Sequence, residues 1–314
     1  IGPIEKDEGY DPNFSAAANI ATAPTGLLIP PSNVMITFSL VSGGTSVAAL
    51  FMAGYIPGAL WALACMLVVY IYAKKAGYRS QTKLTGKEKF NAFIQALPCL
   101  LLIVIVIGGI IAGVFTATEG SVVAVVYSLL LSIYGYKSMK WKDLPEIFRA
   151  SAEMTGIIIF LIGVSSIMSW VMAFTNIPTM VSNGLLSISS NKYVILLMIN
   201  IILLVVGTFM DMTPATLIFT PIFLPVCTAL GMNTIHFGIM LIFNLCIGTI
   251  TPPVGTTLFV GAKVGDVKIE TVFKHLLPYF FAIIVVLMLV TYYTTIKSMV
   301  TWFNGICKLE GRNF

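Results

Sequence analysis

Apolar stretches long enough to cross a membrane recur along this chain, with short polar or basic segments between them. A membrane-spanning helix needs about 20 predominantly apolar residues. The pattern predicts such spans at about residues 47–73, 92–113, 117–134, 153–175 and 276–298, and two interrupted spans at 14–42 and 237–262. With 58% hydrophobic and only 10% charged residues, the chain is expected to be an all-α polytopic membrane protein.

The two interrupted spans share the sequence pattern Gly-x3-Pro-Pro. It occurs at Gly26, Pro30 and Pro31, and again at Gly248, Pro252 and Pro253. Proline has no amide hydrogen and clashes with the preceding turn, so each pair breaks the helix and frees backbone groups. At membrane depth such a break persists only inside protein or beside a polar cavity, and in transporters it marks the substrate and ion site.

The similarity between the two interrupted spans extends beyond this pattern. At the same offset of 222 residues, Gly43 and Phe51 match Gly265 and Phe273. Five matches at one offset indicate an internal repeat.

Charged residues predict the orientation of the spans. Basic residues cluster at 74–89 and at 137–149, where an interfacial helix containing Trp141 is expected, and the positive-inside rule assigns both clusters to the cytoplasm. Residues 176–191 carry no charge and are expected outside. The first interrupted span then runs outward and the second runs inward, which predicts an inverted repeat.

Residues 193–230 cannot form one uninterrupted span, because the polar segment Met210–Pro214 divides them. Two arms around a polar tip predict a re-entrant hairpin that returns to the outer side, and two full spans are the alternative. The hairpin is favoured because its second arm, about 15 residues at about 1.5 Å each, is shorter than a ~30 Å hydrocarbon core.

Asp211, in the tip of this hairpin, is the outstanding carboxylate inside the predicted spans. It is a candidate cation ligand, because a buried carboxylate needs a proton, a partner or a cation, and it is also a candidate cap for the second arm; the two roles are compatible. Hydroxyl and amide side chains flank the two breaks at Thr22, Thr25, Ser32, Asn33, Thr249, Thr251, Thr256 and Thr257. They offer oxygen ligands beside freed carbonyls, or they bond back to their own helices. The helix N-termini after the breaks suit an anionic carboxylate.

Other classes of protein fit less well. The net charge of +5 arises in short loops and does not indicate a nucleic-acid partner. The five cysteines lack metal-ligand spacing, and no nucleophile–base pair indicates an enzyme. A channel would line an open path with rings of polar groups, whereas here they concentrate at two breaks and one tip. Glu119, near a turn between spans, is expected to be a structural cap.

Five runs, in order, resemble the large membrane subunit of tripartite ATP-independent periplasmic (TRAP) transporters: GYDPNFSAAANIATAPTGLLIPPSN, LFMAGYIPG, GGIIAGVFTATEGSVVAVVYSLL, GTFMDMTPATLIFTPIFLPV and FNLCIGTITPPVGTTLFV. The resemblance implies a bacterial inner-membrane protein of the ion transporter superfamily. It also implies sodium as coupling ion, no other cofactor, a carboxylated solute, a periplasmic solute-binding protein and a small membrane subunit as partners. Such a subunit is expected to work as an elevator, in which a transport domain moves against a scaffold.

Carried over residue by residue, the resemblance places sodium at the hairpin tip and at the two unwound segments. The sodium-binding residues it implies are Gly26, Ser32, Asn33, Gly207, Asp211, Thr213, Gly248, Thr249, Thr251 and Thr256. Those expected to contact the solute are Thr25, Ser32, Asn33, Gly255 and Thr256. The family's first hairpin, expected immediately before Tyr10, is absent from this sequence, and Leu27 stands where many members have proline. We therefore expect the chain to be N-terminally truncated, with half of the first cation site missing.

The predicted domains follow from this arrangement. Residues 1–46 form the first broken helix of the transport domain, and 47–175 form scaffold and connecting helices with the interfacial helix near 140–152. Residues 176–265 form the second hairpin and broken helix, and 266–314 a C-terminal scaffold helix and tail. The version APTGLLIPPSN is more similar to sialic-acid and sugar-acid members than to C4-dicarboxylate ones. A dicarboxylate or other organic acid is the alternative, as is a superfamily carrier without a binding protein.

Overall fold

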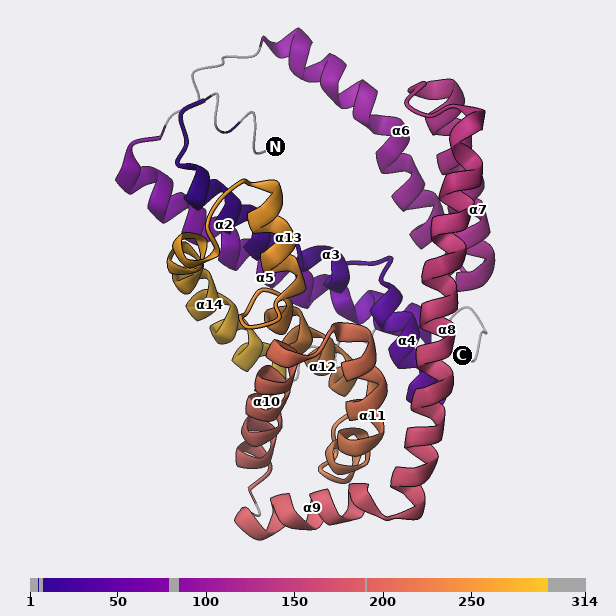
Figure 1. The fold of residues 1–314 in the computed structure, drawn as a ribbon, viewed down its shortest axis with the longest axis vertical. Coiled ribbons are helices and arrows are strands. Elements are labelled where there is room, and N and C mark those ends of the chain that lie inside the picture. The colour runs from indigo at the N-terminus through magenta and orange to yellow at the C-terminus, as the bar shows by residue number, and fades with distance from the viewer. Residues whose placement is uncertain (1–4, 6–7, 79–84, 190, 293–314) are drawn as a thin grey trace. The chain divides into compact units, whose positions relative to one another are not determined.

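The computed structural model describes residues 5, 8–78, 85–189 and 191–292, and helices are the only regular structure among them (Figure 1). In chain order the α-helices are α2 (Pro12–Thr22), α3 (Thr25–Leu28), α4 (Asn33–Val41), α5 (Val47–Ala76), α6 (Gly86–Ile111), α7 (Ala117–Leu130), α8 (Leu144–Phe174), α9 (Ile177–Ile188), α10 (Lys192–Phe209), α11 (Met212–Ala229), α12 (Thr234–Thr249), α13 (Thr256–Val264) and α14 (Ile269–Tyr292). A π-helical turn, Leu131–Gly135, follows α7, and a 3-10 turn, Trp141–Asp143, precedes α8.

Within this part of the chain, seven helices are long and apolar enough to cross a membrane, and the bent pair around the first break forms an eighth candidate. The prediction of an all-α polytopic membrane protein is confirmed. The predicted final span at 276–298 starts earlier, since α14 begins at Ile269, and its last residues lie outside the described ranges. So do Arg79 and Lys83 of the first basic cluster.

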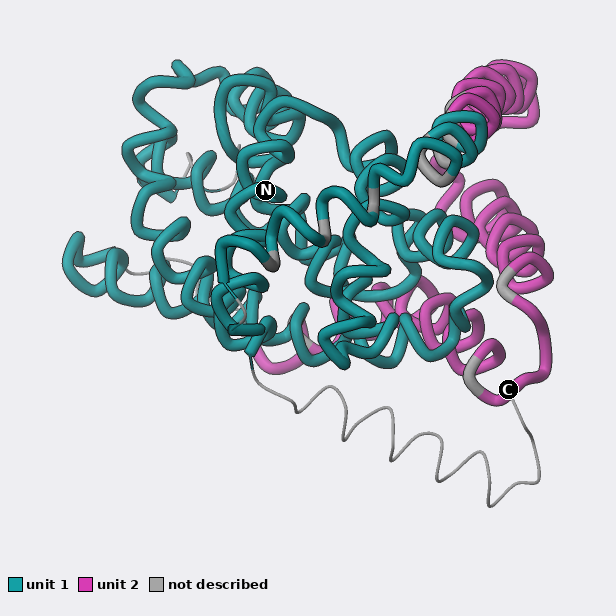
Figure 2. The backbone as a smooth tube through the Cα atoms, turned by 90° about the horizontal axis from the view of Figure 1, so that it is seen from below, with its two compact units in different colours: residues 1–80, 165–314 teal, residues 81–164 magenta. Residues whose placement is uncertain are grey.

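The chain divides into two compact units, residues 1–80 with 165–314, and residues 81–164 (Figure 2). The first unit holds both interrupted spans together with α5, α10, α11 and α14. The predicted division assigned α5 and α14 to the scaffold, whereas packing groups them with the broken helices. The functional division into scaffold and transport domain stays a prediction.

Both interrupted spans break where the Pro-Pro pairs predict. In the first, α2 is followed by α3, which ends at Leu28, and α4 starts at Asn33 with a bend of 46° relative to Pro12–Leu28. In the second, α12 ends at Thr249 and α13 starts at Thr256. Polar side chains cap the starts of α2 and α12, where Asp11 accepts from the amide of Asn13 (2.9 Å) and Asn233 from that of Ile235 (2.8 Å).

The two interrupted spans pack antiparallel. In α13, Gly261 leaves no room for a Cβ beside Ile20 of α2, and in α12 Gly238 leaves none beside Phe38 of α4. The N-terminal half of each copy therefore lies against the C-terminal half of the other, as an inverted repeat requires. The thiol of Cys246 lies 3.9 Å from the carbonyl oxygen of Pro24. These two residues are 222 positions apart, which is the repeat offset, so equivalent positions meet at the crossing of the two copies.

Contacts at the two ends of the first unit agree with the predicted sidedness. At the end predicted to be cytoplasmic, the amide of Asp11 donates to the Tyr78 hydroxyl (3.1 Å), and His275 lies 3.8 Å from the Asp11 carboxylate. At the opposite end, the Tyr292 hydroxyl donates to the carbonyl of Tyr193 (2.9 Å). The starts of α2 and α14 thus share one side with the end of α5, and the start of α10 shares the other with the end of α14.

Two segments differ from their predicted form. The interfacial helix near 140–152 and the span at 153–175 are one continuous helix, α8, because no proline or glycine breaks the chain between them. The uncharged segment 176–191 contains the short helix α9, which packs against α11 and lies crosswise to it (Figure 1).

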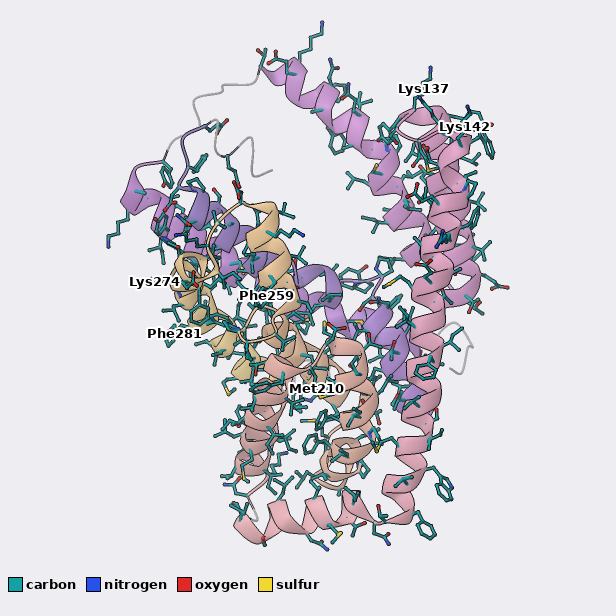
Figure 3. All side chains as sticks on the ribbon, viewed as in Figure 1. Lys137, Lys142, Met210, Phe259, Lys274 and Phe281 are labelled. Carbon is teal, nitrogen blue, oxygen red and sulfur yellow. The ribbon has the colours of Figure 1, made fainter. Side chains whose placement is uncertain are left out.

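The second unit contains the predicted cap at Glu119. Its carboxylate accepts from the amide of Thr116 (2.7 Å), and the Thr116 hydroxyl accepts from the amide of Glu119 (3.3 Å), which forms a capping box at the start of α7. The prediction of a structural cap is confirmed. Lys137 and Lys142 lie at the turn between α7 and α8 (Figure 3).

Candidate functional site

The tip of the α10–α11 hairpin lies against the second helix break. The amide of Val254, in the break, donates to the carbonyl of Thr208 at the end of α10 (3.1 Å). Gly248, the penultimate residue of α12, touches the backbone of Gly207 so closely that a Cβ there would collide with it. Met210 marks the turn from α10 into α11 (Figure 3). The structure thus brings together the tip and the unwound segment that the sequence assigned to one site.

The contact between the hairpin tip and the second break supports a re-entrant hairpin, whereas the length of the second arm does not. The second arm, α11, has 18 residues rather than about 15, so at about 1.5 Å per residue it nearly matches a ~30 Å core. The expected shortness of the arm is therefore wrong. However, the break at residues 250–255 lies halfway along the interrupted span Thr234–Val264. The tip therefore lies beside the middle of that span, which favours a re-entrant hairpin over two full spans.

Asp211 occupies the N-cap position of α11, but its side chain makes no capping hydrogen bond. Asp211 takes part in the hydrogen bonding of the helix only through its backbone carbonyl, which accepts from the amide of Ala215 (3.1 Å). The prediction that the Asp211 side chain caps the second arm is therefore wrong for this structure. Asp211 is exposed, so the premise that its carboxylate is buried is wrong for this structure, and Thr213 is half-buried. Both carboxylate oxygens remain available as hard ligands.

The threonines at the second break bond back to their own helix, which was one of the two predictions for them. The hydroxyl of Thr249 donates to the carbonyl of Cys246 (2.8 Å), and that of Thr251 to the carbonyl of Ile247 (2.7 Å). Each hydroxyl proton is occupied, whereas the oxygen lone pairs can still accept or ligate. Gly255 is the buried N-cap of α13, and Thr256, its first residue, is exposed.

At the first break, too, some polar side chains bond to their own helix while others are exposed. Ser32 is buried and caps α4 by accepting from the amide of Met35 (3.5 Å), while Asn33 is exposed. The Thr25 hydroxyl donates to the carbonyl of Thr22 (2.6 Å), and Gly26 beside it is exposed. Of the prolines, Pro30 is buried and Pro252 half-buried, whereas Pro31 and Pro253 are exposed.

Helix α5 stabilises the first break through groups that the sequence analysis did not identify. The indole N–H of Trp61 donates to the carbonyl of Ala21 (2.8 Å), near the end of α2. Leu28 and Ile29 pack directly against two buried glycines of α5, Gly54 and Gly58. A Cβ at either glycine would collide with them. Their spacing, Gly-x3-Gly, is a known signal for close helix packing in membranes and could have revealed this contact.

A second missed feature is a cluster of three polar side chains inside the apolar interior. Asn244 donates through its side-chain nitrogen to the side-chain oxygen of Asn200 (2.6 Å) and to the carbonyl of Met240 (2.8 Å). Asn200 in turn donates to the hydroxyl of Thr291 (3.1 Å). The available signal was an asparagine inside each of two apolar spans, which is costly in lipid and therefore marks a specific role.

No group of three or more His, Cys, Asp or Glu residues able to hold a metal ion occurs in the described ranges. The oxygen donors at the tip and the second break are a carboxylate, hydroxyls and backbone carbonyls. This donor set suits a hard monovalent or divalent cation rather than a transition metal.

The paired breaks, their antiparallel packing and the hairpin tip against the second break are the features of a secondary transporter of the inverted-repeat class. A family model described as the tripartite ATP-independent periplasmic transporter, DctM component, matches residues 1–296. The chain belongs to this family of large permease subunits and is a multi-pass protein of the inner membrane, not an enzyme.

Several curated relatives are similar over most of the chain. It is 50% identical over 299 residues to the uncharacterized protein YgiK of Salmonella typhimurium, covering 95% of the chain and 68% of that protein. It is 36% identical over 294 residues to the sialic acid TRAP transporter large permease protein SiaM of Vibrio cholerae, covering 92% and 69%. With the C4-dicarboxylate TRAP transporter large permease protein DctM of Pseudomonas aeruginosa the identity is 35% over 284 residues, covering 90% and 66%.

Proposed function

We propose that this chain is the permease of a sodium-coupled carrier that takes up a carboxylated organic solute, delivered by a periplasmic solute-binding protein. A small membrane subunit of the same transporter family is the proposed second partner. The observation that carries the proposal is the contact between the hairpin tip and the second break. It brings the segment that carries the uncapped carboxylate of Asp211 against the unwound segment that carries Thr251 and freed backbone groups.

Sodium is the proposed coupling ion because these donors are hard oxygen atoms. The carboxylate would balance the charge of the ion, and the carbonyls and hydroxyls would replace its water shell. Binding of sodium at this place would stabilise one arrangement of tip and break, which is how an ion couples to the affinity for a solute.

An anionic solute is proposed because two helices of nine residues each, α4 and α13, begin at the breaks. Their N-termini carry unpaired amides and a partial positive charge that favour a carboxylate. The named relatives transport anions: sialic acid, C4-dicarboxylates and 2,3-diketo-L-gulonate. A sialic or other sugar acid is our first candidate because of the similarity of the first break, and a C4-dicarboxylate or other organic acid is the second.

Uptake of radiolabelled solute into vesicles that contain the complete transporter tests the proposal. We expect uptake to require both an inward sodium gradient and the binding protein. Uptake that persists without sodium would overturn sodium coupling, and uptake without the binding protein would favour a carrier of the same superfamily that acts alone. Competition between sialic acid and succinate in the same vesicles distinguishes the two solute classes.

A further inference from the structure

The buried polar cluster between α10, α12 and α14 has no role in the function described so far. Its members are almost completely inaccessible, with exposed fractions of 0% for Asn200, 0% for Asn244 and 2% for Thr291. Three polar side chains from three helices thus meet in an interior that is predominantly apolar.

Stability alone explains this cluster poorly. The side-chain oxygen of Asn244 is buried and has no hydrogen-bond partner, so the cluster retains the cost of an unsatisfied acceptor. Two leucines of similar volume would fill the same space without that cost, and such exchanges of buried polar pairs are often neutral or stabilising. A buried amide pair does, however, form at only one axial position of two helices, and single buried asparagines fix helix register in this way.

The position of the pair on its helices links it to the candidate site. Asn244 is one turn before Gly248 on α12, and Asn200 is two turns before Gly207 on α10, so each asparagine shares a helix face with its glycine. Asn200 contacts Asn244, and further along both helices Gly207 contacts Gly248. Helices α10 and α12 therefore run parallel to each other.

We propose that Asn200 and Asn244 are positioning residues that set the register of α10 against α12 and thereby hold the hairpin tip against the second break. Slippage by one turn, about 5.4 Å, would separate the amides, and it would also move a side chain into the place of Gly207. The backbone bond from Val254 to Thr208 would then be lost. The consequence for sodium binding rests on the proposed function, whereas the register itself does not.

Cross-linking tests the register directly. We would introduce Thr208→Cys and Val254→Cys into a protein whose native cysteines are replaced, because the backbone bond between the two residues brings their Cα atoms close to disulfide range. Oxidative cross-linking is compared between this protein and the same protein carrying Asn200→Leu with Asn244→Leu. Thr291→Val is the matched control, since it removes a hydroxyl from the cluster but leaves the amide pair.

We expect the double leucine variant to lose roughly fivefold in cross-linking yield while its thermal unfolding in detergent is unchanged, and the control to keep its yield. In the complete transporter, the sodium concentration for half-maximal uptake is expected to rise by a similar factor. Unchanged cross-linking in the double variant would overturn the proposal, as would loss of its folded state, which would assign the asparagines to stability. If cross-linking falls in the double variant but uptake by the complete transporter does not depend on sodium, the proposed function is contradicted and the register role stands.

Discussion

Asp211 differs from the threonines around the breaks in how its oxygens are used. The hydroxyls of Thr25, Thr249 and Thr251 donate to carbonyls of their own helices, whereas the Asp211 carboxylate makes no capping bond in α11. At the scale of single residues, the carboxylate is therefore the group most available to a cation, and the hydroxyls can contribute lone pairs without moving.

Asp211→Asn tests this assignment. We expect the variant to insert into the membrane normally but to need a sodium concentration for half-maximal uptake that is roughly tenfold higher, because a negatively charged ligand is lost. Asp266→Asn is the control: it removes a carboxylate from a loop where φ is 50°, a conformation that asparagine also tolerates. Equal sodium activation in both variants would remove Asp211 from the site.

Gly248→Ala tests the close approach of tip and break. The new methyl group would collide with the backbone of Gly207, so we expect a loss of about 1–3 kcal/mol in unfolding free energy together with impaired transport. Thermal unfolding in detergent measures the first effect. Gly156→Ala, in a helix with open space around the new Cβ, should be neutral or stabilising. A fully stable Gly248→Ala variant would show that the two backbones can separate freely.

At the scale of helices, a neighbouring helix supports each break in addition to the local bonds of its own side chains. Helix α5 supplies an indole donor to the carbonyl of Ala21 and two glycines that receive the first break. Helix α10 supplies a carbonyl acceptor and a glycine to the second. The backbone groups that the prolines release are thus partly satisfied across helices, which is what a break inside the membrane requires.

Trp61→Phe is expected to weaken the first of these contacts selectively. The phenyl ring keeps apolar packing against Phe243, whose ring centroid lies 4.8 Å from that of Trp61, but it cannot donate to the carbonyl of Ala21. Loss of a donor to a buried carbonyl should lower the unfolding free energy by about 1–3 kcal/mol. The matched control is Trp170→Phe, because Trp170 is 67% exposed and should have almost no effect in the same unfolding assay.

At the scale of the whole molecule, the antiparallel arrangement of the two copies predicts on which side of the membrane each loop lies. Single cysteines at Lys137 and Lys268 should react with a membrane-impermeant maleimide only from the cytoplasm, and a cysteine at Thr179 only from outside, in a background without native cysteines. All three residues are exposed. Labelling of the Lys268 and Thr179 positions from the same side would contradict the inverted repeat.

The amino-acid sequence was sufficient to predict the class of protein, the two breaks and their antiparallel orientation. These features follow from local chemistry: apolar length, the missing amide of proline and the distribution of lysine and arginine. The cap at Glu119 was predictable for the same reason, since a capping box involves residues only three apart.

Tertiary structure alone decided which groups remain free and which neighbours hold the breaks. The role of Asp211 depended on whether its side chain turned toward its own helix. The grouping of α5 with the breaks and the amide pair of Asn200 and Asn244 join residues 40 or more positions apart. A local pattern such as Gly54-x3-Gly58 can mark a residue for close packing, but it does not identify the partner, because such contacts form only when distant helices approach in one particular register.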